Sequence, residues 1–177
     1  MNQLKFTYYP DPLLRTRAKK VAFENEPPAE MLKLLADMKQ ICREREGIGL
    51  AAQQVGLVLP ALVFGTPEGT DGYKLIGVIN PHIVAYTQQD LWIHEEGCLS
   101  FPGLYFPVAR PTKIVVEGWF DDTEKFEQRK LSDMAARIFL HENDHINGIL
   151  FIDRADERTR LKIKPELRRI AAQSKKH

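Results

Sequence analysis

The fold of this chain depends on one stretch, Leu140-His141-Glu142-Asn143-Asp144-His145-Ile146-Asn147-Gly148. An α-helix turns by about 100° per residue, so His141 and His145 would lie on one face, one turn apart, where both imidazoles can reach a single ion. Glu142 is rotated away from both and could reach a water held at that ion, as a general base does. Asn147-Gly148 would end the helix. We therefore predict a metal-binding helix.

The same helix carries an apolar stripe. Met134 and Ile138 precede the two histidines at spacings of four, three and four residues, so all four side chains should face the interior. Ser132 or Asp133 can cap the start of the helix. The motif alone leaves two interpretations open, because a pair of hydrogen-bonded core histidines would show the same pattern.

Length and composition favour an ordinary globular protein. The 177 residues suffice for one domain over residues 1–177, and 44% hydrophobic with 28% charged residues is unexceptional. We expect no membrane partner, since no apolar run reaches spanning length, and no secretory signal at the start. A cytoplasmic location follows, in a bacterial cytosol or alternatively an organelle, and thiols there stay reduced.

Charge is balanced overall but concentrated at one end. The net charge of +1 argues against DNA as a partner, yet from residue 158 to 177 eight Lys or Arg accompany one acidic residue. This basic tail could touch ribosomal RNA, and a plain solvated face is the alternative. The residues concerned are Lys162, Lys164, Arg168, Arg169, Lys175 and Lys176.

The remaining pattern predicts an α+β fold, with mostly antiparallel strands packed around a central metal-binding helix, an N-terminal helix and a short C-terminal helix. Proline-rich residues 9–12 should form an irregular strand, and apolar residues from Met31 to Cys42 indicate a helix that ends near Gly47. Residues 149–152 should be extended, and a short helix should start at Pro165. The expected strands are 61–64, 74–79, 82–86, 113–120 and 125–131.

The segment Gly47-Ile48-Gly49-Leu50-Ala51-Ala52-Gln53-Gln54-Val55-Gly56 fits neither a helix nor an alternating strand. Two glycines followed by small alanines allow a backbone or a ligand to approach closely, so we expect a contact loop. A nucleotide site is not indicated, because the third glycine of the dinucleotide motif and the Lys-Ser/Thr of the P-loop are missing.

Two histidines leave a catalytic metal site one protein ligand short. Asp153, Asp156 and Glu157 lie downstream, but nothing separates them from surface charge. Cys98 is the better candidate, because it stands beside glycine and before a Pro-Gly turn, where a thiolate can point at an ion. Cys42 falls on an apolar helical stripe and should be a core residue.

Three segments together resemble the peptide deformylase family: Gly47 to Gln54, Glu96 to Ser100, and His141 to His145 with Gly148 following. The opening residues Tyr9 to Arg15 resemble the start of that family as well. The resemblance implies a metallohydrolase that removes the formyl group from the N-terminal formylmethionine of nascent polypeptides and releases formate.

The resemblance also implies residue roles. Cys98, His141 and His145 would hold one divalent metal ion, usually ferrous iron, with zinc, nickel or cobalt as replacements. A metal-bound hydroxide would attack the formyl carbon with Glu142 as the acid/base, and the Gln54 side-chain amide with the Leu99 backbone N–H would form an oxyanion hole.

The substrate peptide should lie as an added strand between Ile48-Gly49 and Gly97, with its methionine side chain near Met134 and Ile138. Core packing is the alternative role for the last two. Two residues depart from the family pattern. Leu140 stands where glutamine is usual, and Tyr105 stands where many members carry an arginine near the substrate.

Glu96 and Arg110 should form an ion pair near the site, as the family resemblance implies. The sequence leaves two other functions open. A zincin-type peptidase would use the same helix but a ligand other than Cys98, and a non-catalytic binding protein could retain the fold without chemistry.

Overall fold

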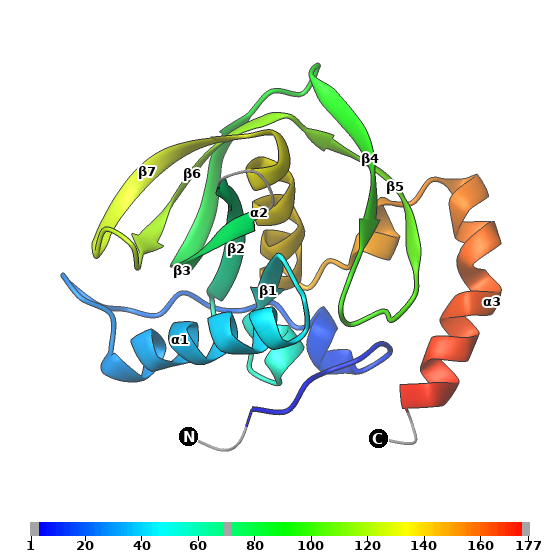
Figure 1. The fold of residues 1–177 in the computed structure, drawn as a ribbon, viewed down its shortest axis with the longest axis horizontal. Helices are drawn as coiled ribbons and strands as arrows, with labels where there is room; N and C mark the ends of the chain where they lie inside the picture. Colours follow the sequence, from blue (N-terminus) through cyan, green and yellow to red (C-terminus); the bar gives the residue numbers. More distant parts are fainter. Residues whose placement is uncertain (1–3, 69–71, 175–177) are drawn as a thin grey trace.

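The computed structural model describes residues 4–68 and 72–174. Its helices and strands follow one another along the chain as Figure 1 shows. In order they are η1 (Pro12–Arg15), α1 (Ala29–Glu44), β1 (Gly49–Ala51), η2 (Ala52–Val55), β2 (Ala61–Glu68), β3 (Gly72–Tyr86), β4 (Leu91–Gly97), β5 (Tyr105–Pro111), β6 (Lys113–Phe120), β7 (Lys125–Ser132), α2 (Asp133–Ile146), η3 (Phe151–Arg154) and α3 (Glu157–Ser174), where η marks a short 3₁₀ helix.

The strands form two antiparallel sheets. The larger has the order β1-β2-β3-β6-β7, and the smaller pairs β4 with β5. Helix α2 lies between them, with β2 on one side and β4 and β5 on the other (Figure 1). The predicted α+β class with a central helix is therefore confirmed.

The larger sheet is covered on both faces. Along β2, Leu62 and Phe64 pack with α2, whereas Ala61 and Val63 pack with α1. A strand buried on both faces needs a continuous apolar run, which is what its sequence shows. The rings of Phe64 and Phe139 meet edge to face with centroids 5.3 Å apart, which fixes α2 against the sheet.

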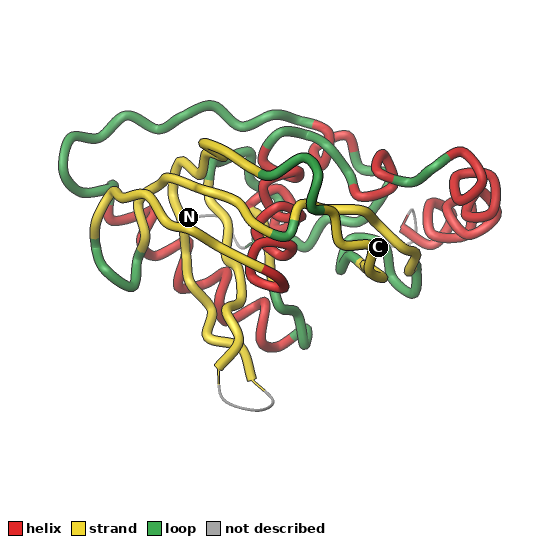
Figure 2. Tube along the Cα trace, turned by 90° about the horizontal axis from the view of Figure 1, so that it is seen from above, coloured by secondary structure: helices red, strands yellow, loops and turns green. Residues whose placement is uncertain are grey.

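The smaller sheet has its own apolar cluster. Phe106 and Val108 of β5 pack with Phe151 of η3 and with Ile163 and Ile170 of α3. Seen from above, α3 lies at the far end of the molecule from the larger sheet (Figure 2). This cluster joins the C-terminal segment to β5, the partner of the strand β4 that ends just before Cys98.

The C-terminal helix differs from the prediction of a short helix that starts at Pro165. Helix α3 runs without interruption from residue 157 to 174, with Pro165 inside it. Ile163, Leu167 and Ile170 face the cluster under α3, and their burial offsets the backbone hydrogen bond that proline cannot make. The predicted start was wrong because tertiary packing outweighs the local preference of proline.

Other predicted boundaries also need correction. The N-terminal segment, predicted as an irregular strand, contains the short helix η1 at Pro12–Arg15. Residues 149–152 were predicted to be extended, but residues 151–154 form the 3₁₀ helix η3. The predicted strands 74–79 and 82–86 are one strand, β3, whose register shifts between Ile79 and His82. Strands β1, β4 and β5 were not predicted, and Ser132 is the N-cap of α2 without a side-chain hydrogen bond.

Within residues 4–68 and 72–174, none of the helices combines the length and the apolar character that a membrane crossing needs.

Candidate metal centre

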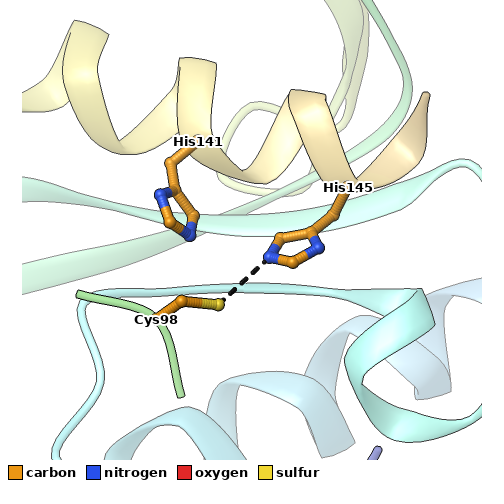
Figure 3. A group of neighbouring side chains, drawn as sticks. All are labelled: Cys98, His141 and His145. Atoms are coloured by element: carbon orange, nitrogen blue, oxygen red, sulfur yellow. Dashed lines mark hydrogen bonds between the residues drawn. The ribbon is translucent and has the colours of Figure 1, made fainter. Parts of the chain in front are cut away.

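Cys98, His141 and His145 converge on one point (Figure 3). Cys98 directly follows β4, and the two histidines lie one turn apart on α2. Their potential ligand atoms all lie within 4.8 Å of one another, and Cys98 Sγ is 3.3 Å from His145 Nε2. The spacing of four residues predicted that the histidines would face inward together, and both are buried.

This Cys-His-His group fits a divalent metal ion. A thiolate and two imidazoles are a donor set that transition metals favour, and three protein ligands leave one position for water or substrate. His141 Nδ1 lies 3.1 Å from Glu96 Oε2, so the Nε2 atom of His141 remains for coordination. The group is consistent with a metal site, and the donor set admits several ions.

Two of the three alternative ligands downstream are engaged elsewhere. Asp153 forms an ion pair with Arg15 and accepts a hydrogen bond of 2.9 Å from the Leu150 N–H. Asp156 accepts one of 2.7 Å from the Thr159 N–H. Of the candidates that the sequence left open, Cys98 is the one that lies with the histidines.

Glu142 lies beside the group at the wall of the same cavity. Its side chain is buried, and its Oε2 atom has no hydrogen-bond partner among the described residues. Burial raises the pKa of the Glu142 carboxyl from its ordinary 4.5 to about 7. A carboxyl with such a pKa can both take up and release a proton near neutral pH.

Gln54 has a fixed side-chain amide. Its Oε1 accepts a hydrogen bond of 2.8 Å from the Ala51 N–H, which turns Nε2 toward Cys98 Sγ at 3.6 Å. Leu99 follows Cys98, and its side chain packs against the apolar cluster that lies between α1 and the larger sheet. Both residues border the same cavity as the metal ligands.

This cavity, here called the cleft, has a volume of about 910 Å³. Every predicted substrate residue lies in its wall: Ile48, Gly49, Gly97, Tyr105, Met134 and Ile138. Across the described chain, β1 pairs only with β2 and β4 only with β5, so each of these two wall strands keeps one unpaired edge. Met134 and Ile138 of α2 also pack with the apolar residues between α2 and the larger sheet, so they border both the cleft and the core.

Two glycines keep the cleft open. A Cβ atom on Gly49 would lie 2.5 Å from Glu142 Oε1 and 2.8 Å from Ile138 Cγ2. The ring of Tyr105 lies against Gly97, so a side chain on Gly97 would collide with it. Tyr105 itself is 64% exposed at the rim.

The predicted Glu96–Arg110 ion pair is confirmed. Arg110 Nε and Nη2 bind the two Glu96 oxygens at 2.7 and 2.9 Å, and Arg110 Nη1 binds Asp144 at 2.8 Å. Burial opposes the charge of Glu96, but the hydrogen bonds from His141 and Arg110 outweigh it and lower the pKa of Glu96 to about 2. The carboxylate that orients His141 is therefore ionised.

Sequence reasoning missed two charged residues of this network. Arg137 forms a buried ion pair with Glu96, and Asp144 pairs with Arg110 and also with Arg154. Their spacing held a signal, since Arg137 lies four residues before His141 and therefore on the same helical face. A charge on that inward face needs a buried partner.

The two remaining sequence candidates are core residues. Cys42 is fully buried in α1 as predicted, and burial raises the pKa of its thiol to about 12, so it stays protonated. Leu140 packs with the apolar residues between α2 and the larger sheet.

The comparison with known families agrees with this geometry. The model of the polypeptide deformylase family matches residues 3–161. This chain belongs to the polypeptide deformylase family. Among curated members, peptide deformylase 1B, chloroplastic/mitochondrial, of Arabidopsis thaliana is 41% identical over 166 residues, which is 93% of this chain and 58% of that protein.

Other deformylases give the same match. Peptide deformylase 1B, chloroplastic, of Oryza sativa subsp. japonica is 41% identical over 85% of this chain and 54% of its own length. The peptide deformylase of Chlorobaculum parvum is 41% identical over 93% of this chain and 86% of its own length. The chain thus spans little more than half the length of the two plant proteins and most of the bacterial deformylase.

The fold is also similar to solved deformylase structures. The crystal structure of plant peptide deformylase PDF1B superposes with a TM-score of 0.86 at 35% identity, over 99% of this chain and 93% of that one. Peptide deformylase from Ehrlichia chaffeensis gives 0.80 at 30% identity, over 94% and 95% of the two chains.

Proposed function

We propose that this protein removes the formyl group from the N-terminal formylmethionine of nascent peptides by hydrolysis and releases formate. One observation carries the proposal: Cys98, His141 and His145 lie within 4.8 Å of one another beside a cleft that Glu142 also lines. A deformylase substrate is an extended peptide with a small acyl group, and the cleft of about 910 Å³ beside the Cys-His-His group suits such a ligand.

The Cys-His-His group would hold the metal ion, and Glu142 would move the proton. When bound, the ion polarises the formyl carbonyl and lowers the pKa of a water molecule. The Glu142 carboxyl takes a proton from the attacking water and passes it to the amine that leaves. Its buried, unpartnered oxygen and its pKa of about 7 support both steps.

Gln54 and Leu99 would stabilise the negative charge on the former formyl oxygen. The Gln54 amide is held in place by Ala51 before substrate arrives, so its Nε2–H₂ group donates without reorganisation. The backbone N–H of Leu99 is the second proposed donor. One such donor contributes about 3 kcal/mol in the transition state.

The peptide would bind as a strand between the unpaired edges of β1 and β4. Backbone groups at Ile48-Gly49 and at Gly97 would pair with it, and Met134 and Ile138 would contact its methionine side chain. The close approach of Glu142 to Gly49 leaves little room at the reacting carbon. A formyl hydrogen fits there better than a larger acyl group.

Three further points belong to the proposal. We infer from the family resemblance that the ion is ferrous iron, and zinc, nickel or cobalt can replace it because the donor set accepts all four. We infer that residues 1–177 act as one catalytic domain. The relatives described above come from bacteria and plant organelles, which supports a bacterial cytosol with an organelle as the alternative.

Contact with the ribosome is a separate part of the proposal. Helix α3 exposes Lys162, Lys164, Arg168 and Arg169, although Arg169 is paired with Glu166. Basic side chains on one exposed helix suit a phosphate backbone. Lys175 and Lys176, which complete the predicted basic tail, lie outside the described residues.

The decisive experiment measures formate release from formyl-Met-Ala-Ser. Iron-loaded protein, prepared without oxygen because oxidation of Cys98 or the iron would abolish activity, should release formate, and Glu142→Ala should not. Cleavage of an internal peptide bond, with metal content unchanged in Cys98→Ala, would support a zincin-type peptidase instead. A metal-loaded protein that releases neither product would support the non-catalytic alternative.

A further inference from the structure

Arg137 is a buried charge that connects the histidine helix to both strands of the smaller sheet. It lies on α2, one turn before His141, and is 3% exposed. Its guanidinium donates to the Glu96 carboxylate and the Trp92 carbonyl of β4, and to the Val108 carbonyl of β5 at 3.1 Å. Its Cζ atom also lies 4.8 Å from the centre of the Trp92 ring.

The Glu96 carboxylate has both oxygens occupied by this network. Oε1 accepts from Arg137 and from Arg110 Nε, while Oε2 accepts from Arg110 Nη2 and contacts His141 Nδ1. The carboxylate therefore cannot rotate without breaking a charged hydrogen bond. Because it is fixed, the ring of His141 is fixed too, with Nε2 directed toward Cys98 and His145.

The ligands of the Cys-His-His group come from two segments far apart in the chain. Cys98 stands two residues after Glu96 at the end of β4, and the histidines stand on α2. Metal–ligand bond lengths vary by only a few tenths of an ångström, so the separation of these segments must be set closely. Arg137 makes hydrogen bonds to both strands from within α2 through two separate nitrogens, Nη1 and Nη2, whereas the donors of a lysine all lie on one nitrogen.

We propose that Arg137 is a positioning residue, which holds the strand before Cys98 and the helix of His141 and His145 at the separation that a metal ion requires. The proposal rests on the proposed function only in that the Cys-His-His group binds a metal. Arg137 touches neither the ion nor the reacting atoms in this account, and it acts through Glu96 and the carbonyl groups of the two strands.

The test compares three variants in zinc-loaded and cobalt-loaded protein. Arg137→Met keeps the aliphatic stem without the charge, and Arg137→Lys keeps a charge without the fork. Arg129→Met is the matched control, because Arg129 on β7 also pairs with two carboxylates, Asp122 at 2.7 Å and Glu127 at 2.6 Å, yet it does not line the cleft. The readouts are zinc release to EDTA, the cobalt absorption spectrum and urea unfolding of the metal-free protein.

We expect Arg137→Met to release zinc about 10–100-fold faster than the parent and to change the cobalt spectrum. The zinc release rate of Arg137→Lys should lie between those of the parent and Arg137→Met. Arg129→Met should keep the parental release rate even if it unfolds at a lower urea concentration. Parental zinc release and cobalt spectrum in Arg137→Met would overturn the proposal, as would equal acceleration in Arg129→Met. If Arg137→Met does not fold, Arg137→Lys decides by the same criteria.

Failure of the proposed function would look different. A parent that retains zinc but releases no formate from formyl-Met-Ala-Ser would contradict the activity and leave the effect of Arg137 on zinc release measurable.

Discussion

A Cβ atom on Gly49 would lie 2.5 Å from the Oε1 atom of Glu142, so strand β1 and helix α2 meet without space for a methyl group. The Glu142 side chain is buried, and the same Cβ atom would lie 2.8 Å from Ile138 Cγ2, so an added methyl group would meet both side chains. This contact places the proposed acid/base directly beside one wall of the peptide site.

Gly49→Ala should therefore reduce kcat/KM for formyl-Met-Ala-Ser by about 100-fold, since displacement of a reacting group by about 1 Å has an effect of that size. Zinc release to EDTA should stay at the parental rate, because the three ligands lie elsewhere. Parental kcat/KM in this variant would contradict the proposed place of Glu142 in the reaction.

Gln54 allows a nearly isosteric test of the oxyanion donor. In Gln54→Glu one carboxylate oxygen can still accept the Ala51 N–H, while the other replaces the amide Nε2 and cannot donate. We expect kcat to fall by about 100–1,000-fold with little change in KM, because the interaction forms only in the transition state. Steady-state kinetics with equal metal content in both proteins make the comparison.

Gln54→Leu serves as the companion variant, since it loses the donor and the Ala51 contact together. It should lose both activity and stability to urea, whereas Gln54→Glu should lose mainly activity. An active Gln54→Glu enzyme would remove Gln54 from the proposed oxyanion hole.

The metal centre could be predicted because its information is local. His141 and His145 lie four residues apart on one strongly periodic helix, so sequence spacing alone places them together. Cys98 was a candidate ligand because of its glycine and Pro-Gly neighbours, and the family resemblance assigned it to the histidine helix, since nothing local connects residues 98 and 141. The Glu96–Arg110 pair likewise joins two strands, and neither strand was predicted.

Strands β4 and β5 escaped prediction for a physical reason. Glu96, near the end of β4, and Arg110 of β5 are charged but face inward, where they neutralise each other, so the usual alternation of apolar and polar residues is inverted at these positions. Strand β1 has only three residues and exists through its pairing with β2. Helix α3 was predicted too short because the cluster that stabilises it across Pro165 is tertiary.

Tyr105 sets a prediction about substrate preference. The resemblance implies that many family members carry an arginine at this position, but the exposed tyrosine ring offers no charge to the second and third residues of a peptide. The KM of the parent for formylated peptides with an acidic third residue should therefore depend little on salt.

Tyr105→Arg should lower that KM at low ionic strength, and added salt should reverse the gain, because a rim-exposed charge is screened. A peptide with a neutral third residue is the control. Identical peptide preferences in the parent and the variant would show that residue 105 does not contact this part of the substrate.

The ion pair between Arg15 of η1 and Asp153 of η3 predicts a pH dependence of stability. Burial opposes the charge of Asp153, but the hydrogen bonds from Arg15 and the Leu150 N–H outweigh it and hold the pKa of Asp153 below its ordinary 3.8. A carboxyl whose pKa is lower in the folded state stabilises the protein above its unfolded pKa, and this contribution is lost as the pH falls through the folded value.

Asp153→Asn should therefore lower the urea midpoint of unfolding at pH 7. The difference in urea midpoint between variant and parent should become smaller below about pH 4, where the carboxyl of the unfolded parent takes up its proton. The effect at pH 7 should shrink when Arg15→Gln is already present, because the two residues act as one pair. A constant difference between parent and Asp153→Asn from pH 7 to pH 3 would contradict a stabilising role for the charge of Asp153, because asparagine keeps an acceptor for the Leu150 N–H and differs mainly in charge.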